Sequence, residues 1–148
     1  MTRSYLTQWR GLLFREKILL VRFALCLPWI SFCIRFFGYL PTRNFLSRLV
    51  RQTVLRQANT TELEDAQRSA ELLLIAGRHG FIPATCLRQS VLLEYWLQRQ
   101  GLNAEIKIGV RKQQELFDAH AWVELNGVAL AQDSLEHHHV MQDRRGES

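Results

Sequence analysis

The chain has 148 residues, of which 47% are hydrophobic and 22% are charged, a balance typical of a folded domain and not of a disordered chain. At this length we expect a single domain, residues 1–148, with its own core. Three cysteines without a C-x-x-C pair argue against a disulfide framework or a four-cysteine zinc site, and they favour a reducing, cytoplasmic setting. No small-residue cleavage site follows the first apolar stretch, so a signal peptide is not expected.

The net charge of +5 is unevenly distributed. Residues 1–57 carry a net charge of +9, almost all of it from Arg, and residues 58–148 carry −4. The Arg residues are spread singly among apolar and aromatic residues, which favours solvated faces of amphipathic helices. A docking face for an acidic partner protein or for a membrane surface is the alternative. We expect no nucleic-acid partner, and no glycine-rich phosphate loop is present.

Residues 1–80 are expected to be mainly helical. Pro28 should end or kink the first helix, and a second apolar run reaches Leu40 before Pro41. The uninterrupted apolar stretch Phe23–Ile34 has only twelve residues, whereas a spanning helix needs about 20. We therefore expect at most peripheral membrane contact. Cys26 and Cys33 lie seven residues apart on this stretch and are expected in the core.

Two more helices are expected before residue 80. One runs from about Leu46 to Gln57. The next begins after Asn59-Thr60-Thr61, an N-cap followed by acidic residues in the first turn. It should reach about Ala76, where Gly77-Arg78-His79-Gly80 is expected to stop it.

Residues 81–140 are expected to form one helix followed by antiparallel strands. Apolar residues recur at three- and four-residue steps from Cys86 to Gln100, and Gly101 sits just past the helix end. Asn103–Val110 alternates as a half-buried strand does, and Lys112–Glu115 is a polar turn. Asn126-Gly127 between two apolar-alternating runs predicts a hairpin with a type I′ turn. The fold class is therefore α+β.

Three residues of this second half suggest a cysteine nucleophile. If the hairpin loop is two residues, Leu125 faces Val128, and the same register sets His120 opposite Asp133 with Cβ atoms about 4.5–5.5 Å apart. Cys86 begins a helix, whose unsatisfied N–H groups would favour the thiolate. A thiol, an imidazole and a carboxylate that orients it are the parts of such a catalytic group.

Each of the three residues also has an ordinary structural reading. Cys86 could be a buried core cysteine, His120 a core or surface histidine, and Asp133 a cap at a strand end. One bulge would shift the register, in which case Asp118 is the fallback orienter. The tract His137–His139 is read as a solvated segment, because three adjacent histidines cannot all face one ion. We expect no metal and no cofactor.

Several short segments together resemble a known family. They are Cys86-Leu87 with Ser90 at the helix start, Gly101, the strand end Ile108-Gly109-Val110, and Ala119–Glu124. This combination resembles the transglutaminase-like proteases of lasso peptide biosynthesis. The resemblance implies a catalytic triad of Cys86, His120 and Asp133 on a papain-like arrangement of helix and antiparallel sheet.

The resemblance also implies a reaction and its partners. The reaction would be removal of the leader from a ribosomally made precursor peptide, after which a separate ATP-dependent cyclase forms the macrolactam. Residues 1–80 show helical periodicity and no run of three short strands, so leader recognition would fall to a separate protein. A cysteine-dependent acyltransferase and a non-catalytic adaptor in a peptide-maturation complex are the alternatives.

Overall fold

The computed structural model describes residues 11–50, 54–79, 85–113 and 116–130. The helices are α2 (Phe14–Phe37), α3 (Tyr39–Val50), α4 (Thr60–His79) and α5 (Cys86–Arg99). They are followed by the strands β1 (Ala104–Gln113), β2 (Leu116–Leu125) and β3 (Val128–Ala129), which pair antiparallel in the order β1-β2-β3. The chain therefore combines helices with a small antiparallel sheet, and the α+β prediction is confirmed.

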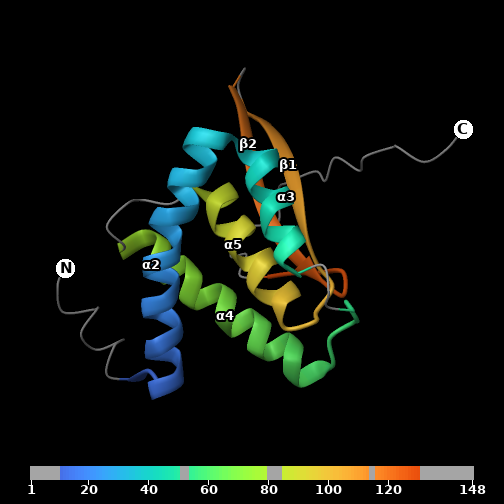
Figure 1. Cartoon of the computed structure of the whole chain (residues 1–148). Helices are drawn as coiled ribbons and strands as arrows, with labels where there is room; N and C mark the ends of the chain where they lie inside the picture. Colours follow the sequence, from blue (N-terminus) through green and yellow to red (C-terminus); the bar gives the residue numbers. More distant parts are fainter. Residues whose placement is uncertain (1–10, 51–53, 80–84, 114–115, 131–148) are drawn as a thin grey trace, which may run out of the picture.

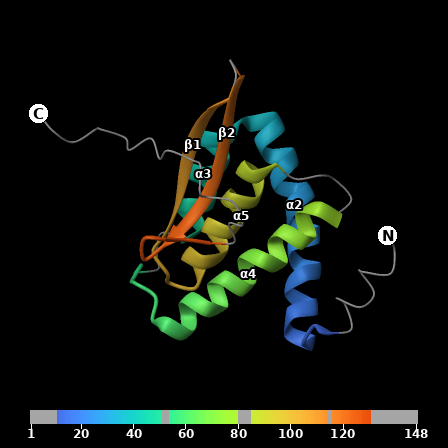
Figure 2. The ribbon, with the colours of Figure 1, turned by 180° about the vertical axis from the view of Figure 1, so that it is seen from behind.

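Helix α5 lies at the centre of the molecule. Figures 1 and 2 show it between the sheet and the other helices, and it contacts α2, α3, α4, β1 and β2. Its buried face joins one core to which the surrounding helices and strands contribute. The largest fully buried side chains of that core are Phe23, Leu27, Leu72, Leu73, Val91, Leu97, Val123 and Leu125. The position of α5 against the sheet is thus fixed by packing on both of its sides.

The hairpin between β2 and β3 has the predicted register. Leu125 pairs with Val128, and Glu124 pairs with Ala129. Asn126 and Gly127 have φ angles of 54° and 77°, the positive values that a type I′ turn requires. The side chain of Asn126 also exchanges two hydrogen bonds with the backbone of Ala58, which ties the turn to the segment before α4.

The boundary between the first two helices differs from the prediction. Pro28 lies inside α2 and does not end it, because Leu27 and Ile30 on either side of it are buried in the core. The break comes at Gly38, whose φ of 89° suits glycine. Pro41 is in the first turn of α3, where its missing N–H is not needed, so α3 begins well before the predicted Leu46.

Two other predicted boundaries were misplaced. Helix α4 continues through Gly77 to His79. A Cβ at residue 77 would lie 2.2 Å from Nε2 of Gln89, so this glycine allows α4 to approach α5 closely and does not terminate the helix. Strand β1 extends to Gln113, so Lys112 and Gln113 belong to the strand and not to a turn.

Helix α2 is apolar on two faces. The inner face packs into the core through Leu20, Phe23, Leu27 and Ile30. The outer face is exposed, and its large apolar side chains recur at steps of three and four residues: Phe14, Ile18, Val21, Leu25, Trp29, Phe32 and Phe36.

One sequence-based expectation for α2 fails, and the apolar helix is longer than the stretch that the sequence analysis considered. Cys26 is exposed and Cys33 is only partly buried, so the seven-residue step does not place both in the core. The helix has 24 residues, includes Arg22 and Arg35, and is long and apolar enough to cross a membrane by length and composition alone. Only 28% of its apolar window is buried inside the molecule. The expectation of at most peripheral membrane contact stays a prediction.

Candidate active site

Cys86 is the first residue of α5, as predicted. The preceding residue, Thr85, is extended (φ −70°, ψ 159°), and its carbonyl accepts the first helical hydrogen bond, from the N–H of Gln89. The first turn contains no acidic residue, so nothing in it opposes the positive end of the helix dipole. The partly buried thiol is thus held at a helix N-terminus by a helix that is itself anchored in the core.

The thiol lies against β2. The backbone N–H of Ala121 donates a hydrogen bond to Sγ of Cys86, with an N to S distance of 3.5 Å. Ala121 directly follows His120 in β2, so the thiol lies beside the strand position next to His120, although the two residues are 34 positions apart in the chain. A backbone N–H aimed at sulfur stabilises negative charge there.

The contact lies on the side of β2 that faces β3. Backbone groups along an antiparallel strand point alternately to either side. The carbonyl of Val123 accepts a hydrogen bond from the N–H of Leu130, on the β3 side. Ala121 lies two residues from Val123, so its N–H points to the same side. There the sulfur of Cys86 accepts this hydrogen bond, beyond the last described residue pair of β2 and β3.

His120 shares a face of β2 with Trp122 and Glu124, next to the backbone N–H of Ala121 that meets the sulfur. Ala121, Val123 and Leu125 are buried toward the helices, and the residues between them point away. The ring of His120 stacks on that of Trp122, with centroids 6.3 Å apart and planes inclined by 24°. Its pairing partner in β1 is Gly109, which has no side chain to occupy the space beside the imidazole.

Trp122 supports this arrangement. It is only 3% exposed, and its Nε1–H donates a hydrogen bond to Glu124, 3.1 Å away on the same face of β2. The indole is therefore fixed in orientation, and it offers the imidazole a rigid apolar wall. The sequence-based reasoning named His120 but did not assign this role to Trp122.

The carboxylate of the expected triad lies outside the described residues. Asp133 and the tract His137–His139 both fall there, so their positions stay predictions. The backbone of Asp118 belongs to β2 and pairs with Arg111. Among the described residues, no group of three His, Cys, Asp or Glu side chains is placed to hold a metal ion.

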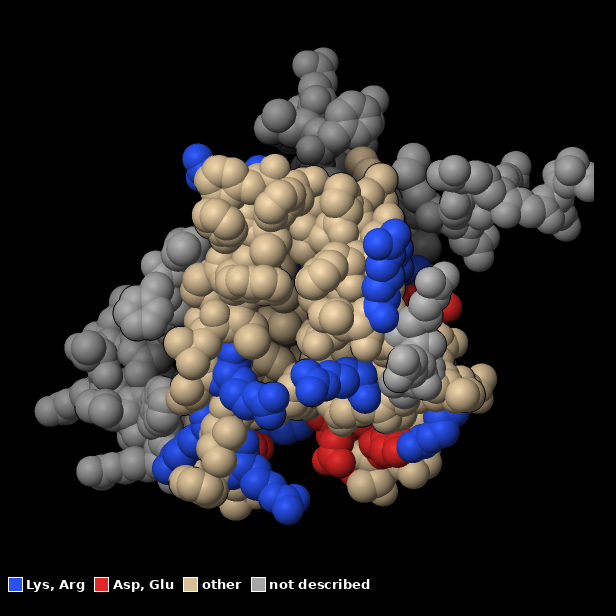
Figure 3. Space-filling model, viewed as in Figure 1, with Lys and Arg blue, Asp and Glu red and all other residues tan. Residues whose placement is uncertain are grey.

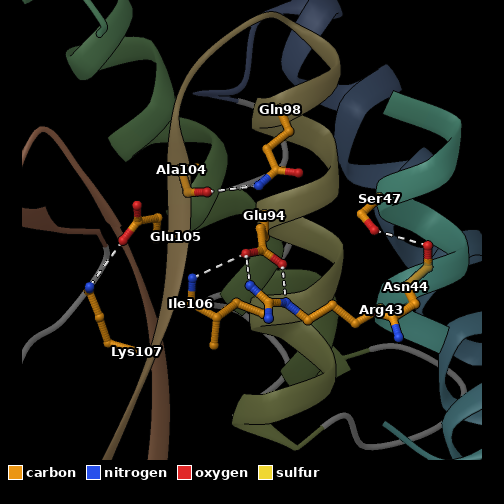
Figure 4. Close-up of polar contacts among 9 residues, drawn as sticks. All are labelled: Arg43, Asn44, Ser47, Glu94, Gln98, Ala104, Glu105, Ile106 and Lys107. Atoms are coloured by element: carbon orange, nitrogen blue, oxygen red, sulfur yellow. Dashed lines mark hydrogen bonds and ion pairs between the residues drawn. The ribbon is translucent and has the colours of Figure 1, made fainter. Parts of the chain in front are cut away.

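A half-buried ion pair fixes the helix that carries Cys86. Figure 4 shows Glu94, on the buried side of α5, bound by both arms of Arg43 from α3, with distances of 3.0 Å from Nε and 2.8 Å from Nη2. The backbone N–H of Ile106 in β1 donates to the same carboxylate, at 3.3 Å. These hydrogen bonds with Glu94 raise the pKa of Arg43 above its ordinary value.

The network joins three elements around one carboxylate. Glu94 is 5% exposed, and a buried carboxylate requires partners of this kind. Gln98, one turn further along α5, donates to the carbonyl of Ala104 and adds a second link to β1. The sequence signal was a single Glu between buried apolar residues of α5, and it was not recognised as an ion-pair partner.

The fold and the candidate site together define a class of protein. The class is an α+β protein with a cysteine at the start of a central helix and a histidine on the adjoining antiparallel strand. The model of the transglutaminase-like superfamily matches residues 36–142, and the chain belongs to this family. Its members are usually cysteine proteases or transferases. Searches of curated proteins and of solved structures found no match to the chain.

Proposed function

We propose that the chain is a cysteine peptidase that removes the leader from a lasso precursor peptide, so that a separate cyclase can form the macrolactam. One observation carries the proposal. The thiol of Cys86, at a helix N-terminus, lies 3.5 Å from the backbone nitrogen of the residue after His120. Membership of the transglutaminase-like superfamily supports cysteine chemistry at this place, and the segments around Cys86 and His120 resemble those of lasso leader peptidases.

The first half of the proposed reaction is acyl transfer to sulfur. The Cys86 thiolate attacks the carbonyl carbon at the leader–core junction, and the backbone N–H of Cys86 is a natural donor to the resulting oxyanion. The C–N bond then breaks. The His120 imidazolium gives its proton to the departing amine of the core peptide.

The second half is hydrolysis of the leader thioester. His120, now neutral, takes a proton from water as the water attacks the thioester carbonyl. Collapse of this intermediate releases the leader as a carboxylic acid and returns the thiolate and the imidazolium. We assign to Asp133 the task of holding the imidazole tautomer and stabilising its charged form.

The proposal includes two protein partners and a compartment. A separate leader-recognition protein presents the precursor, and an ATP-dependent cyclase takes the released core amine. We place the reaction in the cytoplasm, where the precursor is made and where free thiols persist. The three cysteines of the chain are free.

Mass spectrometry of the precursor tests the peptidase proposal. The precursor is incubated with the protein and the leader-recognition partner, and Cys86→Ala is compared with Cys26→Ala. We expect the unchanged chain and Cys26→Ala, which removes an exposed thiol of α2, to release leader and core. Cys86→Ala should release neither. Cleavage by Cys86→Ala would refute the nucleophile assignment.

An added amine separates hydrolysis from acyl transfer. With hydroxylamine present, a thioester intermediate yields leader hydroxamate in competition with the free acid. A free leader acid in the absence of amine supports a peptidase. Leader products that form only when an amine is supplied would instead identify an acyltransferase.

A further inference from the structure

The outer sides of α2 and α3 form one large exposed apolar surface, which we name the outer surface. Its aromatic members on α2 include Trp29, Phe32 and Phe36, each 55% exposed or more. On α3 its members include Leu40, Phe45 and Leu49, each at least 52% exposed. Figure 3 shows a broad uncharged expanse in the upper part of this face, with Lys and Arg side chains below it and on its right-hand side. Soluble proteins rarely expose a contiguous apolar area of this kind unless it binds something.

The charges around this surface have one sign. Helices α2 and α3 contain six basic residues and a single acid, Glu16, which accepts a hydrogen bond from Arg68 of α4. Arg15, Arg35 and Arg48 are exposed, and within the described part of the chain none of them forms an ion pair. An occupant of the outer surface therefore meets apolar and aromatic side chains together with positive charge.

The inner face of α2 excludes a spanning orientation for the folded protein. Leu20, Phe23, Leu27 and Ile30 of this helix are each 5% exposed or less, and they pack against the core. The guanidinium of Arg22 lies 4.9 Å from the ring centroid of Trp96 in α5, which adds a second attachment. A helix crossing a bilayer would have to withdraw all of these groups from the core. The helix can present only its outer face.

We propose that the outer surface docks the protein on an anionic phospholipid bilayer, with α2 lying in the plane of the interface. The aromatic and aliphatic side chains of the outer surface enter the boundary between lipid headgroups and acyl chains, and the Arg residues beside them bind lipid phosphates. The positive charge around the apolar surface favours an anionic bilayer as its occupant, because such a bilayer is apolar within and negative at its surface. The proposal is independent of the peptidase reaction.

Vesicle co-sedimentation tests this proposal with the full-length protein. We expect the protein to sediment with vesicles of phosphatidylglycerol mixed with phosphatidylcholine, and to bind pure phosphatidylcholine vesicles much more weakly. Raising the salt concentration should weaken the binding. Cys86→Ala should sediment as the unchanged protein does, so failure of the peptidase reaction and failure of docking are distinguishable.

Two pairs of variants assign the binding to the outer surface. Trp29→Gln with Phe32→Gln should reduce vesicle binding by more than about tenfold. The matched control, Ile108→Gln with Val128→Gln, also removes two exposed apolar side chains, but from the sheet, and should change binding little. Arg35→Gln with Arg48→Gln should weaken binding roughly twentyfold. The control pair, Arg99→Gln with Lys107→Gln, removes the same charge from α5 and β1 and should change vesicle binding little.

Several outcomes would overturn the proposal. One is equal binding to anionic and neutral vesicles, and another is no binding to either. A third is an equal loss of binding in the test pairs and in their controls. Dimerisation in solution that buries Trp29 and Phe32 and abolishes vesicle binding would show that a second copy of the chain covers this surface. Circular dichroism and thermal unfolding of each variant confirm that the fold is retained.

Discussion

Helices α5 and α2 are both built on apolar side chains, yet they stand in opposite environments. Helix α5 is covered on every side, and its buried carboxylate, Glu94, has partners for both oxygens. Helix α2 leaves one apolar face exposed, and Ser31 on its buried side has a hydroxyl without a hydrogen-bond partner among the described residues. The contacts around α5 fix the position of that helix, whereas α2 keeps an exposed apolar face that packs against no other part of the described chain.

The largest effect expected from the α5–β2 contact is catalytic. His120→Ala removes the general acid and base, so leader release should fall at least about 100-fold. The rate at which iodoacetamide alkylates Cys86 at neutral pH should also fall, because the imidazolium no longer favours the thiolate. Exposed Cys26 serves as the internal control for alkylation. If leader release and alkylation of Cys86 both kept their rates, the assignment of His120 to the site would be refuted.

The ion pair that holds α5 gives the next largest effect. Arg43→Leu leaves the Glu94 carboxylate buried without its charge partner and should lower the free energy of unfolding by about 3 kcal/mol. Arg43→Leu with Glu94→Leu should recover most of this loss. Urea denaturation measures both variants.

Arg48→Leu provides the contrast within α3. Arg48 is exposed, so its substitution should alter stability by less than about 0.5 kcal/mol. If Arg43→Leu were equally mild, the pair would not hold α5 in place, and the difference drawn between the two helices would lose its main support.

The close approach of α4 to α5 predicts that the effect of Gly77→Ala depends on Gln89. Gly77→Ala alone should change stability by less than about 0.5 kcal/mol, because moving the end of the Gln89 side chain away from the new Cβ offsets the helix propensity that alanine adds. In a Gln89→Ala background the same substitution should stabilise by up to about 1 kcal/mol, since alanine is the better helix former. Thermal unfolding of the four proteins measures this coupling. Additive effects would contradict the contact.

The smallest effect concerns pH and the start of α4. Glu62, in the first turn of α4, has its pKa lowered to about 2. The main cause is the hydrogen bond that its carboxylate accepts from Arg56, and the second is the one from the backbone N–H of Asn59. Because this pKa lies below its ordinary value of 4.5, the stabilisation is complete above about pH 4.5 and is lost as the pH falls toward 2. Glu62→Gln should therefore flatten the dependence of Tm on pH in this range. Glu64→Gln in the same turn is the control.

The second half of the fold could be predicted from the sequence because its signals are local. Asn126-Gly127 defines the turn by its φ angles alone, and the alternation after it defines the register. The helix start at Cys86 and Gly101 beyond its end follow from the same kind of short-range pattern. These two elements suffice to predict that the thiol lies near the strand of His120.

The remaining features depend on tertiary contacts that no local pattern reveals. Proline and glycine usually interrupt helices. Nevertheless, α2 continues through Pro28, where Leu27 and Ile30 are buried in the core, and α4 continues through Gly77, where the side chain of Gln89 from α5 occupies the space beside the glycine. The partner of Glu94 lies 51 residues away, beyond any spacing rule. Which face of α2 meets the core also depends on α4 and α5, so the exposure of Cys26 could not be anticipated.

The hydrogen bond from Ala121 to the sulfur makes the backbone of β2 a reporter of the chemistry at Cys86. A thiolate is a strong acceptor for this N–H, whereas the sulfur of a thioester is a poor one. Each acylation of Cys86 would therefore weaken a contact at the edge of the strand that carries His120, and each hydrolysis would restore it. In the proposed reaction, the covalent state of Cys86 would thus be transmitted to the sheet through a single amide.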